Sequence, residues 1–273
     1  MSVDPTFTEQ WYREAHLEFE QQESRLRPMV NETRFTGKTY HWPVYENESA
    51  IAGKARHADV NIITQVTKDV SATVEPIYAA YMIDDWDAAR SSVDYRSVIN
   101  KKAAGAIWRK YDDLVIDALN TGQTTETTLA DANQFSYNSA VSVAEVLDLN
   151  DVPSDMRYGL LSPGGCTDIQ QDTTYINNFH NQNQIVRGGS QVIPGVAGID
   201  YVKTTRLPNG DAGATERRGF AWQKMALGVA LAQDFRVTVD WVPEKQGYLF
   251  VASMVMAAKV FDDTGVVAFD VAN

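Results

Sequence analysis

The sequence predicts an α+β protein in which long strands and one long helix are separate from a compact α/β segment. Residues 34–75 and the last forty residues alternate apolar and polar side chains with the period of a β-strand. Residues 91–120 instead repeat apolar side chains every three or four positions, which predicts a helix of about 45 Å at ~1.5 Å per residue. A Thr-rich linker after this helix leads into short helices and strands, so the chain is expected to contain more than one structural part.

Composition limits the possible functions before any motif is considered. The chain has 273 residues and a formal charge of −12, from 24 Lys and Arg against 36 Asp and Glu. Such an acidic surface repels phosphate backbones, so we expect at most sparse contact with nucleic acid. The single cysteine excludes an intramolecular disulfide. The sequence shows no signal-peptide pattern and no stretch of the ~18 apolar residues that span a bilayer, so we expect folding in a cytoplasm and no membrane partner.

Residues 1–33 are interpreted as an N-terminal arm. Phe7, Trp11 and Phe19 recur at helical spacing and predict an amphipathic helix over residues 7–27. Residues 1–33 carry seven acids and three bases. Two interpretations stay open at this point: a core helix of an ordinary domain, or an arm that packs against a neighbouring subunit.

Residues 34–75 predict an extended loop built as a β-ribbon. Tyr40, Trp42 and Tyr45 belong to its first strand, and the stretch between its strands carries Lys54 and Arg56. Two arms of about ten to fifteen residues at ~3.3 Å each give a ribbon of roughly 30–50 Å. Because an isolated two-stranded ribbon is barely stable in water, we expect it to lie on a surface, which can belong to another molecule.

The remaining chain divides into three predicted segments. Residues 76–122 form a peripheral domain whose spine is the long helix, and residues 123–234 form a compact α/β domain. Within that domain we expect helices near 137–147, from after Gly165 to about Phe179, and over 221–233, with a short buried strand at 158–161. Residues 235–273 return to strands and close the peripheral domain, with a turn at 262–265.

No motif indicates catalysis, a cofactor or a metal. Cys166 follows two glycines at a predicted helix start, where its thiol pKa could be lowered, and His180 is the histidine closest to it in sequence. Nothing in the sequence pairs the two, so a small buried or capping cysteine is the simpler interpretation. The four histidines lack metal-ligand spacing, and no glycine pattern forms a phosphate-binding loop. The chain is therefore expected not to be an enzyme.

Charged pairs are interpreted in the same conservative way. Asp84-Asp85, Asp112-Asp113 and Asp262-Asp263 are expected to lie on solvated faces or in turns, because adjacent carboxylates on a helix point in different directions. Arg217-Arg218 is an isolated basic doublet and does not indicate a nucleic-acid site.

The order of these segments resembles the major capsid proteins of tailed phages, which have the Hong Kong 97-like fold. Its parts are an N-arm (1–33), an extended loop (34–75), a peripheral domain (76–122 and 235–273) and an axial domain (123–234). Three stretches of sequence are similar to the family: Val152-Pro153 through Arg157 to Ser162-Pro163, then residues 223–230, and residues 241–260.

The resemblance implies a subunit that assembles as hexamers and pentamers into an icosahedral head around double-stranded DNA, with only weak contact to that DNA. It also implies a portal partner and allows a cement protein. Since no long extension precedes the arm, a separate scaffolding protein is expected. The implied location is the virion, after assembly in the host cytoplasm. Two rivals stay open: a nanocompartment shell protein with the same fold, and a thiol-dependent enzyme built on residues 123–234 with Cys166 as nucleophile.

The residues expected to make contacts between subunits follow from charge and aromatic content. Residues 34–75 carry five bases and five acids, so the other residues hold the whole charge of −12. Aromatic side chains concentrate interface energy, which makes Tyr40, Trp42 and Tyr45 the first candidates. Lys54 and Arg56 are predicted to reach an acidic patch on a neighbour formed by Asp84, Asp85 and Asp87; a solvated loop tip is the alternative.

Overall fold

The computed structural model describes residues 21–46, 48–54, 56–57, 59–60, 62–86, 95–129, 134–172, 192–211 and 213–272. The chain forms two compact units. The first comprises Met1–Ser24, Pro76–Tyr111 and Gln233–Val255, and the second comprises Arg25–Glu75, Asp112–Ala232 and Met256–Asn273. Three long elements run from one unit into the other: helix α2 (Tyr95–Gly122) and strands β11 (Leu227–Val242) and β12 (Gly247–Val260).

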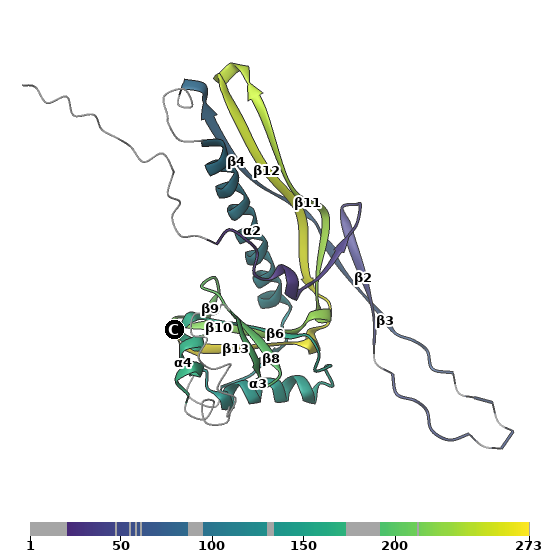
Figure 1. The fold of residues 1–273 in the computed structure, drawn as a ribbon. Coiled ribbons are helices and arrows are strands. Elements are labelled where there is room, and N and C mark those ends of the chain that lie inside the picture. The colour runs from purple at the N-terminus through teal and green to yellow at the C-terminus, as the bar shows by residue number, and fades with distance from the viewer. Residues whose placement is uncertain are drawn as a thin grey trace, which may run out of the picture. The chain divides into compact units, whose positions relative to one another are not determined.

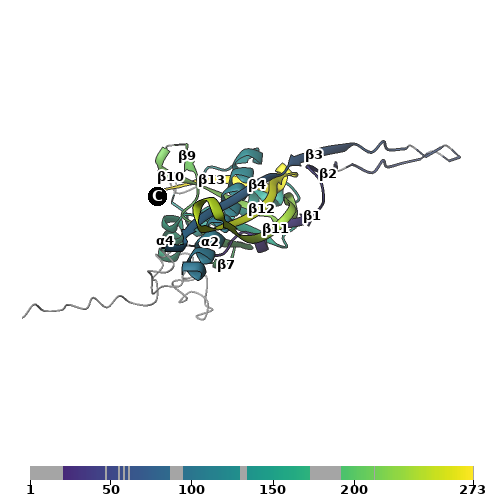
Figure 2. The ribbon, with the colours of Figure 1, turned by 90° about the horizontal axis from the view of Figure 1, so that it is seen from above.

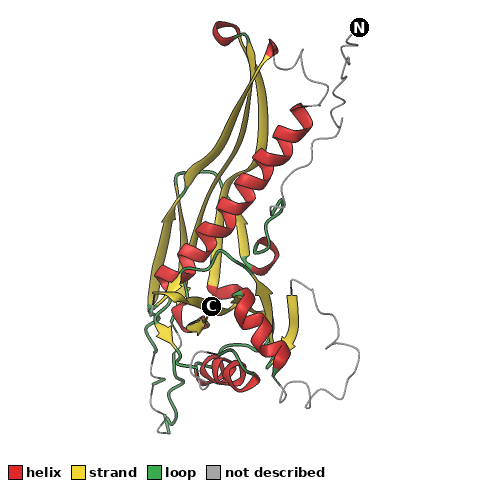
Figure 3. Ribbon diagram, turned by 90° about the vertical axis from the view of Figure 1, so that its left-hand side faces the viewer, coloured by secondary structure: helices red, strands yellow, loops and turns green. Residues whose placement is uncertain are grey.

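The first unit pairs a sheet with a helix. Strand β4 (Glu75–Asp84) forms one edge of a four-stranded sheet with the order β1-β11-β12-β4, and β1 (Asn31–Arg34) joins β11 in the second unit. Helix α2 lies along the sheet (Figures 1 and 3). The ring centroids of Trp108 on α2 and Phe235 on β11 are 5.7 Å apart, which joins the helix to the sheet inside this unit.

Side-chain periodicity explains both partners of this packing. On β12 the residues at every second position, Phe250, Ala252 and Met254, are buried, as expected for a strand with one covered face. On α2 the buried residues Ala103 and Ile107 are spaced by four, as expected for one apolar stripe. The turn between β11 and β12 is a 3-10 helix (Pro243–Lys245) closed by Gln246 in the left-handed region.

The second unit is a seven-stranded sheet covered by two helices. Its path is β5-β13-β10-β6-β8-β7, with β9 paired to β10. The strands are β5 (Thr125–Glu126), β6 (Arg157–Leu161), β7 (Val192–Val196), β8 (Ile199–Lys203), β9 (Asn209–Gly210), β10 (Gly213–Gln223) and β13 (Val266–Ala272). Helices α3 (Tyr137–Leu149) and α4 (Pro163–Gln171) contribute to the same hydrophobic core as strand residues such as Tyr201 and Phe269. Short 3-10 helices lie at Arg27–Met29, Lys224–Ala226 and Asp263–Gly265.

The extended loop is an antiparallel hairpin of its own. Strands β2 (Thr39–Tyr45) and β3 (Thr67–Thr73) pair over seven residues, from Thr39 with Thr73 to Tyr45 with Thr67. They form a separate two-stranded sheet, and the connection between them extends away from the paired strands (Figures 1 and 2). The predicted β-ribbon is thus present, but each of its paired strands has seven residues and not the expected ten to fifteen or so.

Most element types agree with the sequence-based prediction, and one is wrong. The long helix, the helix near 137–147 and the strand at 158–161 are present as α2, α3 and β6. The helix predicted over 221–233 is instead the end of β10, a short 3-10 turn and the start of β11. Residues 227–231 are buried at every position, so this strand is covered on both faces and shows no alternation to reveal it.

Other differences concern the extent of elements. Helix α4 ends at Gln171, and residues 173–191, including most of its predicted continuation, lie outside the described residues. Residues 1–20 of the predicted arm helix also lie outside them, whereas residues 21–26 are not helical. Strand β13 joins the sheet of the second unit through seven pairs with β10, so the end of the chain is not confined to the peripheral strands. The five segment boundaries stay predictions.

Candidate functional site

The hairpin's base is packed against its own chain. Trp42 on β2 is only 8% exposed and stacks on Phe261 with a centroid distance of 6.0 Å. A Cβ added to Gly228 would lie 3.0 Å from Cε2 of Trp42, so the indole packs directly on the backbone of β11. Tyr40 contacts Trp42 edge to face at 4.8 Å and Phe35 at 5.1 Å. These contacts all lie within the second unit.

This packing concerns the aromatic part of the interface hypothesis, which stays a prediction. Trp42 was expected to anchor a neighbouring subunit, but its ring is already covered by its own chain. Tyr40 is half-buried beside it. Tyr45, at the far end of β2, is 60% exposed and remains available for an intermolecular contact. Strand alternation identified these aromatic residues correctly, but it could not show which molecule covers each face.

Beyond Tyr45 the connecting segment exposes an unusual amount of apolar surface. Ile62 is 92% exposed and Val60 is 71% exposed. We name the exposed large apolar residues of this segment the tip cluster: Tyr45, Ile51, Val60, Ile62, Ile63 and Val66. Single exposed apolar residues are normal on a surface, but a concentration within one segment marks an interaction site. The tip cluster is therefore the strongest candidate for a binding surface among the described residues.

The predicted charged contacts are accessible but untested. Lys54 and Arg56 are exposed in the connecting segment, and Asp84 and Asp85 are exposed at the end of β4. Asp84 accepts a hydrogen bond from the backbone N–H of Trp86 at 3.1 Å, while the backbone N–H of Asp85 donates to Gln246. Asp87 lies outside the described residues. The pairing of these bases and acids between two copies stays a prediction.

The candidate nucleophile is in the wrong environment for catalysis. Cys166 lies on the buried face of α4, in the core of the second unit. Burial raises the pKa of Cys166 to about 11, so the thiol is protonated at neutral pH. A reactive cysteine requires the thiolate and some exposure. His180 lies outside the described residues, so its distance from this thiol is not defined.

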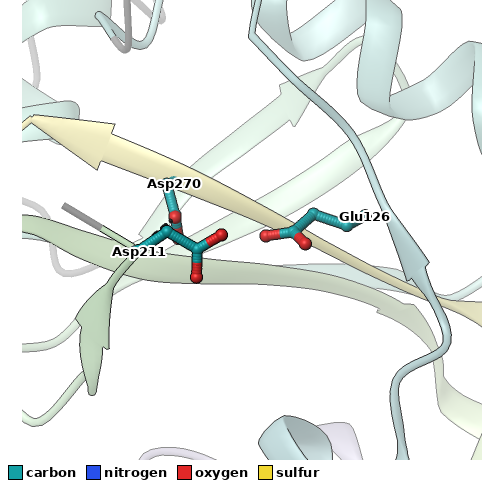
Figure 4. A group of neighbouring side chains, drawn as sticks. All are labelled: Glu126, Asp211 and Asp270. Atoms are coloured by element: carbon teal, nitrogen blue, oxygen red, sulfur yellow. Dashed lines mark hydrogen bonds between the residues drawn. The ribbon is translucent and has the colours of Figure 1, made fainter.

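Three carboxylates converge on one guanidinium at the edge of the seven-stranded sheet. Glu126, Asp211 and Asp270 come from β5, the β9–β10 turn and β13, and their oxygens lie within 4.8 Å of one another (Figure 4). Arg218 on β10 donates to all three, at 2.7, 2.6 and 3.1 Å. The hydrogen bond to Asp270 raises the pKa of Arg218. The Arg218 guanidinium occupies the position among the three carboxylates that a metal ion would take. These ion pairs therefore link β10 to β5 and β13.

The acid pair on α2 was also misinterpreted from sequence. Asp112 is 3% exposed and accepts hydrogen bonds from the backbone N–H groups of Arg25 and Leu26 at 3.1 and 3.4 Å. Asp113 forms a two-point ion pair with Arg206. A sequence signal for such roles is weak, because neighbouring acids on a helix usually face solvent. Here they fix the end of the arm and the segment after β8.

The polar side chains between Val152 and Pro163 fix a loop and cap a helix. The guanidinium of Arg157 is buried and donates to the backbone carbonyls of Val152 and Pro153, and it pairs with Asp148 near the end of α3. Ser162 caps α4 by accepting from the backbone N–H of Gly165 at 3.1 Å. Arg157 thus fixes the loop between α3 and β6.

A groove of about 250 Å³ lies between the base of the hairpin, α2 and β12. Its lining includes Glu75, Asp117 and Lys259 together with threonine and apolar side chains. No histidine or cysteine is among the described residues that line it. No helix in the described part of the chain is long and apolar enough to cross a membrane.

Comparison with known proteins agrees with this architecture. A model of a family described as phage capsid protein matches residues 3–272. The capsid of the cyanophage P-SCSP1u has a TM-score of 0.81 at 19% identity, covering 98% of this chain and 94% of that chain. The capsid asymmetric unit of cyanophage Pam1 has a TM-score of 0.75 at 12% identity, covering 100% of this chain and 98% of that chain. Mycobacterium phage Che8 has a TM-score of 0.74 at 17% identity, covering 98% of this chain and 98% of that chain. A search of curated protein sequences found no match. The structural likeness confirms the expected Hong Kong 97-like fold.

Proposed function

Since the chain belongs to the phage capsid protein family, we propose that it is the major subunit of an icosahedral phage head, assembled as hexamers and pentamers around double-stranded DNA. Its function is structural: it buries surface between copies of itself, and it catalyses no reaction. The location is the virion, after assembly in the host cytoplasm. A separate scaffolding protein and a portal are the further partners of assembly, and a cement protein can be added to the outside.

The tip cluster carries this proposal. Interfaces between subunits need an apolar centre with a charged rim. The tip cluster supplies apolar side chains that its own chain leaves exposed, and Lys54 and Arg56 supply charge in the same segment. The base of the hairpin packs on its own chain through Trp42, and the segment that carries the tip cluster continues from this packed base. A second copy is the partner whose surface would complete the burial.

The acidic composition suits a shell that binds its packaged DNA only weakly. A charge of −12 per chain repels phosphate groups, so the shell does not retain the DNA by tight binding. We propose that contacts with DNA are few and local. Strong retention of duplex DNA by empty shells at physiological salt would contradict this part of the proposal.

The decisive experiment compares particle assembly by the purified wild-type chain with assembly by a variant that lacks two apolar side chains of the tip cluster. The double variant Ile62→Ser and Val60→Ser removes apolar contact area while leaving charge unchanged, and Val141→Ser on α3 is the matched control on a distant exposed site. We expect the wild-type chain and the control to form closed particles by negative-stain microscopy, alone or with a scaffolding protein. We expect the double variant to remain as free subunits or open capsomers. Equal yields of closed particles from all three would remove the tip cluster from the interface.

The charged part of the interface has its own test. Reversing Lys54 and Arg56 to glutamate should weaken assembly because like charges then meet Asp84 and Asp85 of the neighbour. Adding Asp84→Lys and Asp85→Lys to the same chain should restore particle yield by recreating opposite charges. If the combined variant assembles no better than the first, the bases and acids do not meet. The nucleic-acid content of purified particles then separates a phage head from a shell that encloses a cargo protein.

A further inference from the structure

Three loops of the second unit are hydrogen-bonded to one another and form a corner. They are residues 149–156, 224–226 and 261–265. The backbone N–H of Lys224 donates to the carbonyl of Met156 at 3.0 Å, and the carbonyl of Ala226 accepts two backbone N–H groups of the third loop at 3.1 and 3.4 Å. The side chain of Asn150 donates to the backbone carbonyl of Thr264 at 3.2 Å, which links the first loop to the third. The three loops therefore lie side by side.

This corner leaves large apolar side chains uncovered. Leu149 is 75% exposed, Met156 is 59% exposed and Met225 is 56% exposed, and we name these three residues the methionine corner. Met156 has a φ of 54°, in the left-handed region that residues other than glycine seldom adopt, and Arg157 holds the same loop through hydrogen bonds to its backbone carbonyls. Exposed apolar residues that are grouped on a fixed surface mark an interaction site.

The charges around the methionine corner determine the chemistry of its partner. Residues 148–156 and 261–265 contain five acids and no base. Asp151 and Asp155 are exposed, and their carboxylates have no hydrogen-bond or ion-pair partner among the described residues. Lys224, the base of the middle loop, directs its ammonium to a backbone carbonyl at 2.9 Å. A partner that covers this corner must therefore combine apolar surface with positive charge.

One helix face of the same chain has these properties. Residues 95–111 of α2 contain five bases and no acid. Lys102, Ala106 and Lys110 are spaced by four, so they lie above one another on the helix. Both lysines are exposed and have no partner among the described residues. Their stems are apolar and can cover methionine side chains while the ammonium groups stay in contact with water or carboxylates, and the small Ala106 leaves room between them.

We propose that the methionine corner of one copy binds the Lys102–Ala106–Lys110 face of α2 on a second copy. The methionine side chains lie on Ala106 and on the lysine stems. The two ammonium groups, about 12 Å apart along the helix axis, meet Asp151 and Asp155. Because each copy has a charge of −12, most pairs of surfaces repel, whereas these two attract and select one orientation.

The two surfaces differ, so the contact joins copies head to tail and can close a ring. The inference rests on the proposed self-assembly of the chain. It uses no residue of the hairpin, so it can fail while the role of the tip cluster holds.

Disulfide cross-linking tests the contact directly. Met156→Cys is combined with Ala106→Cys, in a chain whose buried Cys166 is replaced by alanine. The matched control combines Met156→Cys with Lys245→Cys, since Lys245 is exposed at the turn between β11 and β12. After mild oxidation, we expect a ladder of dimers and larger multimers on a non-reducing denaturing gel for the first pair only. A monomer-sized band of altered mobility, equal ladders from both pairs, or no cross-link overturns the proposal.

Cross-linking is scored in particles and in the concentrated soluble subunit. Closed shells without the ladder would overturn this inference and leave the proposed function intact. A ladder in a chain that never forms closed shells would support the contact and contradict the proposed function.

A charge test that leaves the native cysteine in place guards against misfolding of the cysteine variants. Lys102→Glu with Lys110→Glu should lower the yield of particles several-fold, because like charges then meet at the corner. Adding Asp151→Lys and Asp155→Lys to the same chain should restore the yield by recreating opposite charges. The control Arg236→Glu with Lys245→Glu makes the same change in net charge at exposed sites elsewhere and should assemble as wild type does. Unchanged yield in the first variant, an equal loss in the control, or no recovery in the combined variant overturns the proposal.

Discussion

Replacing Trp42 by alanine should destabilise the second unit without changing any exposed surface of the hairpin's far end. The indole is 8% exposed, stacks on Phe261 and packs on the backbone at Gly228. Replacing a buried aromatic residue by alanine costs about 3–5 kcal/mol through lost burial and a residual cavity. The indole N–H is buried and has no hydrogen-bond partner among the described residues, and removing an unsatisfied donor returns about 1 kcal/mol. The net expectation is a loss of about 2–4 kcal/mol in the free energy of unfolding.

Tyr45 provides the matched comparison on the same strand. It is 60% exposed, so Tyr45→Ala should change the free energy of unfolding by less than about 0.5 kcal/mol. The assay is urea unfolding of the unassembled subunit followed by circular dichroism, with particle yield measured in parallel. We expect Trp42→Ala to lower stability and to speed tryptic cleavage in the hairpin, and Tyr45→Ala to lower only particle yield. A Trp42→Ala subunit as stable as wild type, or a Tyr45→Ala subunit as unstable as Trp42→Ala, would refute the division of the hairpin into a packed base and a binding tip.

Three further predictions concern the second unit. Because burial raises the pKa of Cys166 to about 11, iodoacetamide should label the folded chain far more slowly than the urea-unfolded chain at pH 8. The folded state then holds its proton more tightly, so this residue's contribution to stability should be full below pH ~9 and be lost as pH rises through about 11, as measured by urea unfolding. Tyr201→Phe should be neutral or stabilise the fold by up to about 1 kcal/mol, since the buried hydroxyl has no hydrogen-bond partner in the described part of the chain; a loss above about 1 kcal/mol in thermal unfolding would contradict this. Arg218→Ala should destabilise the fold by about 1–3 kcal/mol at pH 7, most of it through the poorly exposed Asp270 that would lose its partner; an unchanged free energy of unfolding in urea would contradict this.

Sequence periodicity predicted those elements that have one covered face. Helix α2 shows a stripe at Ala103, Ile107 and Tyr111, and β2 alternates around Trp42, so the pattern and the structure agree. The pattern failed over residues 227–231, where burial on both faces removes any alternation and leaves a continuous apolar run. Such a run fits a buried helix and a central strand equally well, and only the pairing with β1 and β12 decides between them.

The roles of individual polar residues were harder to predict than the elements. Asp112 has the sequence context of a solvated helix acid, yet it accepts two backbone hydrogen bonds from a segment more than eighty residues away. Arg218 belongs to an isolated basic doublet, yet two strands and a turn bring carboxylates to it. Both roles depend on contacts between distant parts of the chain, which local sequence does not encode. Trp42 shows the same limit for apolar residues, because alternation identifies a buried face without identifying what covers it.

Electrostatics explains why the binding surface should lie on the hairpin. Each copy carries a charge of −12, so two copies repel wherever their acidic surfaces approach within the Debye length, ~8 Å at physiological salt. Residues 34–75 carry five bases and five acids, so the hairpin can approach a neighbour without adding to that repulsion. Its apolar tip cluster then supplies the attraction. The hairpin is thus a part of this chain whose association with another copy meets little electrostatic repulsion, and the acidic remainder disfavours contacts between two acidic surfaces.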